Sequence, residues 1–432
     1  SSDLRLAPEA RWITMTATLS ASAAVPLLSW TPLAFYAGDG AYGTAKDSAL
    51  FPGIEYLLAE EQSSSTDFFD PPGHLRYLPH PNKVTVPLMA VTVQGLSCGL
   101  MWDPRATWDG MHDRPGALFA SPNTWSGQEN HLIALTVPGP LMAGENRAEG
   151  LEPYLLPAGR TLQLEARLFA TPAADALAPL ALYLRANGLP ALPPLPRSEA
   201  QGVRLGLEAL MGPTWDGAAR RWHMALADPW GPRLDPASEL HLWLGALRGE
   251  LSAAEEAEWR ARVRELSEIE CCTDPDLAYR QFVLHMHLAD TAVMHDLSPL
   301  AARAYAQNAE GFWPYAPGKD EGRPLGTAGD TSSGQIATNA LWLLRHARIT
   351  GDPETRAAGL KALAYLEARH ARRPEGAQVW ELQLHCPDLL AAAKAEQCYL
   401  EAYRLTGEAR YAERAQWWAL SGLPFVYLWS AA

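Results

Sequence analysis

The second half of the chain repeats a short motif in which one helix ends and another begins. The two copies are His346-Ala347-Arg348-Ile349-Thr350-Gly351-Asp352-Pro353-Glu354 and Ala402-Tyr403-Arg404-Leu405-Thr406-Gly407-Glu408-Ala409-Arg410, which lie 56 positions apart. A glycine directly after a helix and an acidic residue at the start of the next are typical of a short connection between helices. Each copy therefore predicts a tight turn within a helical pair, and the repetition favours stacked or circularly arranged pairs.

Helical spacing of apolar residues extends on both sides of these turns. It predicts one helix before the first turn and another at the end of the second copy, from Ile336, Ala340, Leu343, Leu344 and Ala347 and from Tyr411, Ala415 and Trp418. Two further amphipathic patterns cover 252–268 and 276–295. The region after residue 250 is thus expected to consist of helical hairpins.

Two long connections separate the predicted helices, at 310–333 and 369–387. If the tight turns lie at one end of the helical pairs, these connections must lie together at the opposite end. They hold most of the residues suited to chemistry, namely Trp313, Tyr315, Asp320, Arg323, Asp330, Trp380, Glu381 and His385, with Asp388 directly after them. We therefore expect a site where the two connections meet.

The centre of that site is expected in the segment 376–388. Its residues alternate with period two, which is typical of extended chain. Glu381, Gln383 and His385 would share one face, with Trp380 and Leu382 on the other. Pro387 and Asp388 predict the start of a helix.

The first 180 residues predict antiparallel sheet. Apolar and polar residues alternate over 12–19 and 161–168, a pattern that buries one face of a strand and exposes the other. A hairpin is expected around Gln94-Gly95, and 131–137 is another apolar run. Many short strands without helices between them favour a sandwich.

The overall prediction is a multidomain α+β fold. An antiparallel β-sandwich occupies 1–183, a proline-rich linker 184–200, and an α/α hairpin domain, a complete or partial toroid, 201–432.

Composition excludes several classes of partner and cofactor. The net charge of −14 argues against nucleic acid and anionic membrane surfaces, and no apolar run reaches the roughly 18 residues of a membrane span. The five cysteines form no CxxC pair, and no nucleotide-binding motif occurs. His285 and His287 would diverge on a helix, so we expect no metal and no cofactor. The oligomeric state stays open, and a secreted or periplasmic location is favoured only slightly.

Paired carboxyl groups beside aromatic residues suit hydrolysis of a glycosidic bond. We expect Glu381 as the general acid and Asp330 or Asp388 as the base. The predicted substrate-binding residues are Trp313, Tyr315, Arg323, Trp380, Gln383 and His385. Structural roles compete with these: Asp330 and Asp388 could cap helices, Glu381 could pair with an arginine, and Trp380 could be a core residue. Trp313 and Tyr315, in a loop rich in glycine and proline, are the better candidates for sugar platforms.

A sheet domain, a linker and helical hairpins with their long loops at one end resemble the six-hairpin glycosidase-like enzymes. The segments WELQLHCPD at 380–388 and GDTSSGQ at 329–335 share in this resemblance. It implies an α/α toroid with catalytic carboxylates on loops at its mouth, matching Glu381 and Asp330 or Asp388. The chain departs from the pattern because it predicts six or seven helices after residue 250, fewer than the twelve of a complete toroid.

Two alternatives stay open. Polysaccharide lyases resemble the chain in parts but usually place the toroid first; a lyase could use His385 or Tyr315 as base and Arg323 to neutralise a uronate. A non-catalytic carbohydrate-binding or scaffold protein is the third hypothesis.

Overall fold

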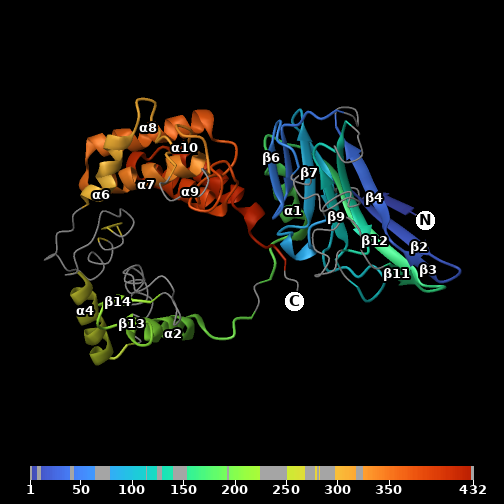
Figure 1. Ribbon diagram of the computed structural model, residues 1–432, viewed down its shortest axis with the longest axis horizontal. Helices are drawn as coiled ribbons and strands as arrows, with labels where there is room; N and C mark the ends of the chain where they lie inside the picture. Colours follow the sequence, from blue (N-terminus) through green and yellow to red (C-terminus); the bar gives the residue numbers. More distant parts are fainter. Residues whose placement is uncertain are drawn as a thin grey trace. The chain divides into compact units, whose positions relative to one another are not determined.

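The protein forms two compact units in the computed structural model (Figure 1). Unit 1 comprises Ser1–Ala191, Pro387–Leu389 and Trp417–Ala432, and unit 2 comprises Leu192–Cys386 and Leu390–Gln416. The structure describes residues 2–6, 11–38, 43–63, 78–112, 114–123, 129–139, 153–191, 194–223, 251–267, 278–279, 282, 297–317 and 325–429.

A seven-stranded antiparallel sheet forms the larger part of unit 1. Its strands lie in the order β1 (Ser2–Leu6), β2 (Trp12–Ser20), β12 (Thr161–Pro172), β8 (Leu96–Met101), β7 (Leu88–Val93), β5 (Ser48–Phe51) and β6 (Glu55–Leu58). The predicted hairpin is confirmed: β7 pairs with β8, and Gln94 and Gly95 between them have φ values of 51° and 75°. The alternating segments at 12–19 and 161–168 pair with each other as β2 and β12.

A second sheet shares its core with the first. It has the order β4 (Trp30–Ala37), β10 (His131–Val137) and β9 (Gly116–Ala120), and a separate pair joins β3 (Val25–Leu27) to β11 (Tyr154–Leu156). Phe51 of the large sheet and Phe119 of the second contact each other with ring centroids 5.6 Å apart. Buried side chains of both sheets surround this contact, among them Met89, Leu100 and Ile133.

One helix and the end of the chain cover the large sheet on its other side. Leu180 and Tyr183 of α1 (Ala178–Asn187) pack with Phe169 of β12 and with Leu428. The apolar run at 425–429 therefore has its packing partners within unit 1.

Unit 2 is mainly helical. Its described α-helices and strands are α2 (Glu199–Met211), β13 (Trp215–Asp216), β14 (Arg221–Trp222), α4 (Ala253–Ser267), α6 (Ser298–Ala301), α7 (Ser333–Thr350), α8 (Pro353–Arg369), α9 (Leu389–Thr406) and α10 (Ala409–Ser421). The first residue of α9 and the end of α10 from Trp417 belong to unit 1. The predicted helix at 252–268 is confirmed as α4, whereas most of that at 276–295 lies outside the described residues.

The repeated turns are confirmed in position and chemistry. Gly351 ends α7 at φ 77°, and the carboxylate of Asp352 accepts hydrogen bonds from the first backbone N–H groups of α8. Gly407, between α9 and α10, has φ 73°. The fold is thus mixed α+β, as predicted, while the described helices do not establish a toroid.

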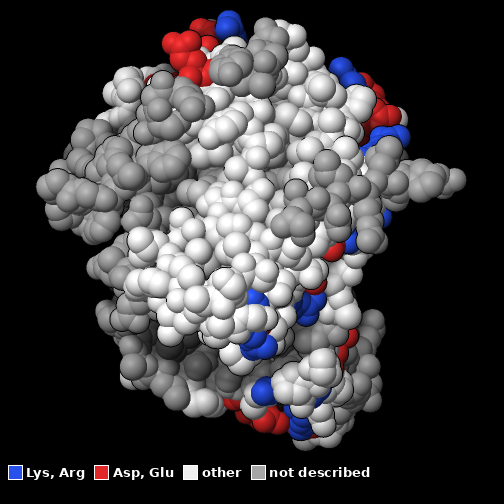
Figure 2. Space-filling model, turned by 90° about the vertical axis from the view of Figure 1, so that its right-hand side faces the viewer, with Lys and Arg blue, Asp and Glu red and all other residues white. Residues whose placement is uncertain are grey.

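Charge is distributed in small groups on the face drawn in Figure 2, where much of the described surface carries neither acidic nor basic side chains. Within the described part of the chain, no helix combines the length and apolar character needed to cross a bilayer.

Candidate functional site

The two long connections of unit 2 meet, as the sequence predicts. The backbone N–H of Leu384 donates to the carbonyl of Leu325 at 2.8 Å, and the hydroxyl of Ser332 donates to the carbonyl of Gly376 at 3.0 Å. The side chains of Asp330 and His385 complete the junction at 2.7 Å. Residues 55 positions apart in the sequence therefore face each other at one site.

The segment 376–388 is not extended, which corrects the prediction from its alternation. The N–H groups of Glu381 and Leu382 both donate to the carbonyl of Gln378, so the chain turns instead of running straight. An extended segment needs a neighbouring strand to satisfy its backbone groups, and here turns and the link to Leu325 satisfy several of them. Tertiary contacts thus override the period-two pattern.

His385 lies between two carboxylates. Its Nε2 is 2.7 Å from Oδ2 of Asp330, and its Nδ1 is 3.2 Å from Oε1 of Glu375. The other carboxylate oxygen of Glu375 accepts hydrogen bonds from the guanidinium of Arg373, at 2.7 Å and 3.2 Å. Asp330 and His385 are about half exposed, whereas Glu375 and Arg373 are largely buried. The buried pair of Arg373 and Glu375 therefore holds His385 and, through it, Asp330, both of which solvent can reach.

These contacts determine the charge of each group. The hydrogen bond with Glu375, followed by that with Asp330, raises the pKa of His385 to about 9 against the lowering effect of partial burial. Burial raises the pKa of both carboxyl groups, but their hydrogen bonds, chiefly with His385, outweigh it and the net shift is downward. At neutral pH the imidazole is protonated and donates from both ring nitrogens to ionised carboxylates.

The backbone around Ser333 holds the buried pair in place. The Ser333 hydroxyl donates to the carbonyls of Arg373 and Glu375, and it accepts from the N–H of Glu375 at 2.9 Å. The N–H of Gly334 donates to the carbonyl of Glu375 at 2.8 Å. The first turn of α7 thus fixes the segment that carries Glu375.

Sequence reasoning missed Glu375 and Arg373. Both lie in the connection 369–387, in the run Arg372-Arg373-Pro374-Glu375, but no spacing distinguishes them from surface charges. The only available signal was their place in the same connection as His385.

The other predicted residues of this loop are exposed. Trp380 is 64% exposed, which corrects its interpretation as a core residue, and Glu381 and Gln383 are exposed too. Glu381 lies 3.4 Å from the amide of Gln378, so it is not the buried partner of an arginine. Asp388 is only 3% exposed and belongs to unit 1. Arg323 and Asp320 lie outside the described residues.

Trp313 and Tyr315 are buried, in contrast to their prediction as sugar platforms. The indole N–H of Trp313 donates to the carbonyl of Arg303 at 2.9 Å, and the N–H of Leu325 donates to the hydroxyl of Tyr315 at 3.2 Å. Their loop packs inward, so the two rings support the site from within. In the other connection, 369–387, the side chain of Trp380 is exposed to solvent.

Comparisons with known proteins do not assign a family. No family profile matches the chain, and no curated protein matches it. One solved structure, described as a polysaccharide lyase, is similar over 98% of this chain and 70% of its own, with 10% identity and a TM-score of 0.29. Likeness of that degree carries no argument about this chain.

The charged cluster predicts a pH-dependent stability. Below pH 6.5, the ordinary pKa of histidine, the stabilisation by protonated His385 is fully present, because the imidazole is protonated in both states. As pH rises towards about 9, the unfolded chain loses that proton first and the stabilisation is lost. Because the ring is half exposed, we expect a loss of about 1–2 kcal/mol.

Denaturant titrations across this range check the prediction, with His385→Gln as the matched variant. We expect the variant to lose less stability than the native chain between pH 6.5 and 9. Equal slopes in both proteins would show that the imidazolium does not stabilise the fold.

Proposed function

We propose that the chain is a carbohydrate-active enzyme that hydrolyses glycosidic bonds in a polysaccharide or oligosaccharide. The observation that carries the proposal is the half-exposed, ionised carboxylate of Asp330, held by a protonated His385. Such a carboxylate can act as a general base that activates water, or as a nucleophile. The hydrogen bond from His385 fixes the orientation of the Asp330 carboxylate. Sequence pattern and exposure of the loop favour a sugar substrate.

Glu381 is the proposed general acid, and Trp380 beside it is the proposed sugar platform. Both are exposed on the loop that carries His385, so a substrate could reach all three. The apolar C–H face of a sugar ring packs on an indole in water. Asp388 is left out as the base because it is buried.

Among the residues that the structure describes, the charges at the site favour hydrolysis over elimination. A lyase needs a cation that neutralises the uronate carboxylate of its substrate. Here both ring nitrogens of His385 already face carboxylates, and Arg373 faces Glu375. Two cations and two anions cancel, so this cluster attracts a neutral sugar at least as readily as an acidic one.

The architecture that we propose for this activity is a β-sandwich followed by an α/α arrangement of the six-hairpin glycosidase-like kind. The helical pairs α7–α8 and α9–α10, which begin 56 residues apart, support it. A toroid whose loops carry the site at one end would give a long substrate room to bind.

Asp330→Asn is expected to lower turnover by about 10²–10⁴-fold, the usual contribution of a general base. The test is release of reducing ends from a panel of polysaccharides. Asp352→Asn is the matched control, because asparagine also caps helices well and α8 should be kept. Glu381→Gln should lose activity to a similar extent.

Other outcomes would overturn the assignment. Unsaturated products from the native chain would indicate a lyase. Sugar binding without turnover, unaffected by loss of Glu381, would indicate a binding protein. Full activity in Asp330→Asn would remove this residue from the mechanism.

A further inference from the structure

Unit 1 contains a small cavity of about 250 Å³ that the proposed hydrolysis does not use. Its walls come from the end of β8 and the residues after it, from β12, from α1, and from the last described residues of the chain. The lining side chains that matter are Trp102, Asp103, Arg105, Arg167, Tyr183 and Trp429. The volume lies just below the roughly 300–1,000 Å³ of pockets for drug-sized ligands, so it suits one ring.

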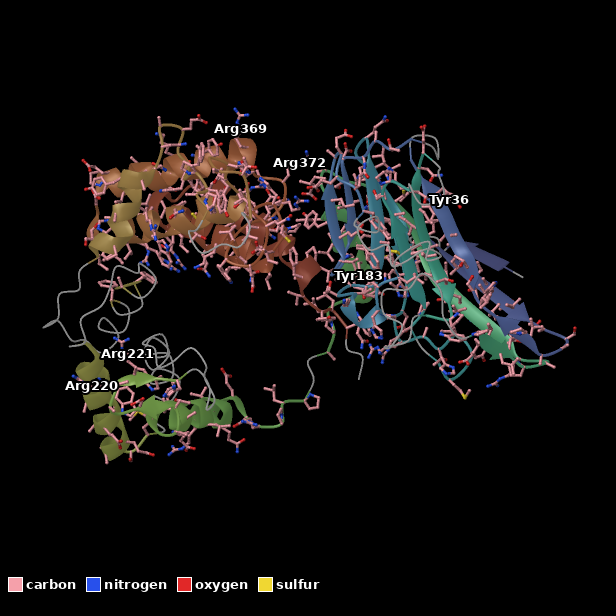
Figure 3. All side chains as sticks on the ribbon, in the orientation of Figure 1. Tyr36, Tyr183, Arg220, Arg221, Arg369 and Arg372 are labelled. Carbon is pink, nitrogen blue, oxygen red and sulfur yellow. The ribbon has the colours of Figure 1, made fainter. Side chains whose placement is uncertain are left out.

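Tyr183 lines this cavity. The residue lies on α1 (Figure 3). It is only 6% exposed. The charged side chains of Asp103, Arg105 and Arg167 line the same cavity and act on its hydroxyl. Burial, followed by the charge of Asp103, raises the pKa of Tyr183 to about 12, while Arg167 and Arg105 act against the rise. A neutral donor therefore lies near two cations.

The two arginines lack carboxylate partners among the described residues. Arg167 is held over the ring of Trp12 at 5.7 Å and donates to the side-chain amide oxygen of Asn187 at 3.0 Å. Asp103, the acid in the cavity wall, accepts from the backbone N–H of Arg105 and not from its guanidinium. The wall thus carries one more positive charge than negative, with donors that match a carboxylate or a phosphate.

The aromatic walls are fixed in place. The indole N–H of Trp429 donates to the carbonyl of Val84 at 2.6 Å. The backbone N–H of Trp102 donates to the carbonyl of Pro87 at 3.3 Å. Both residues are mostly buried, so only part of each lines the cavity. Rigid apolar walls opposite charged donors are typical of pockets that hold a small polar ring.

We propose that this cavity binds one anionic sugar unit, with its acidic group at Arg105 and Arg167, a hydroxyl or the acid at Tyr183, and its ring against the tryptophans. The proposal is independent of Asp330, because all of its residues belong to unit 1. It gives the sheet unit a binding role of its own, for an acidic residue in a mixed polysaccharide.

Calorimetric titration of the whole chain tests this with three probes: methyl glucuronide, glucose 6-phosphate and methyl glucoside. We expect at least one acidic probe to bind, and the neutral glucoside to bind at least tenfold more weakly. Binding of the glucuronide alone identifies a carboxylate ligand, and binding of the phosphate alone a phosphorylated one.

Two variants test the residues, and a third serves as control. Arg105→Gln and Tyr183→Phe should each weaken binding by about tenfold, since arginine and tyrosine would each lose a hydrogen bond to the ligand. Arg105 is exposed and phenylalanine keeps the packing of the Tyr183 ring, so both variants should fold. Arg185→Gln removes an exposed charge from α1 outside the cavity and should leave binding unchanged.

Three results would overturn the proposal. They are no binding of either acidic probe, equally tight binding of the neutral glucoside, and binding that survives both Arg105→Gln and Tyr183→Phe.

Discussion

Gly376→Ala is expected to destabilise unit 2 by about 4 kcal/mol, because two costs act at one residue. Gly376 has φ 70°, a left-handed conformation that side chains disfavour. A Cβ atom there would also overlap the carbonyl oxygen of Leu384 and the side chain of Ser332. The backbone oxygen cannot move without breaking the turn that carries His385, so we expect the site to be distorted as well.

Gly329→Ala separates the two costs. Gly329 has φ 91° in the facing connection, but nothing lies within 4 Å of the added Cβ. It should lose only about 1 kcal/mol, from the backbone conformation alone. Denaturant titrations followed by the helical circular dichroism signal compare the two variants. Similar losses would mean that the close approach around Gly376 is relaxed in solution.

The sequence predicted the parts of the fold that local chemistry controls. Gly351 and Gly407 end their helices wherever the rest of the chain lies, and Gln94-Gly95 closes a hairpin between adjacent strands. The meeting of the two long connections followed from the same turns, since helical pairs of similar length return the chain to the same end. These predictions needed no knowledge of distant contacts.

Predictions that depended on the surroundings of a loop fared worse. Trp380 was assigned to an apolar face and Trp313 to the surface, whereas the first is exposed and the second is buried. Side-chain exposure in a turn depends on which segment packs against it. Here the loop is held by Ser332, which hydrogen-bonds Gly376 from 44 positions earlier in the sequence, and by Leu325, which hydrogen-bonds Leu384. Glu375 was missed for the same reason: its partners Arg373 and His385 meet it only once the loop is folded.

The second large effect concerns Trp429, which belongs to the apolar run near the end of the chain. This run packs on the sheet unit: Leu428 lies with Phe169 and Leu180, and Phe425 lies with Leu50 and Tyr56. The hydroxyl of Thr85 donates to the carbonyl of Pro424 at 2.6 Å, and the N–H of Leu428 donates to the carbonyl of Thr85 at 2.9 Å. The run is therefore an integral part of the sheet unit.

Trp429→Ala is expected to lower the free energy of unfolding of unit 1 by about 3–5 kcal/mol, the usual loss for a buried tryptophan. The variant loses the buried ring, and the carbonyl of Val84 loses the indole N–H that it accepts at 2.6 Å. Trp429→Phe keeps most of the ring and loses only the hydrogen bond, so it should cost about 1–2 kcal/mol. Titrations followed by the sheet circular dichroism signal give both values. If alanine cost no more than phenylalanine, the ring would contribute little, and the end of the chain would lie against the sheet without stabilising it.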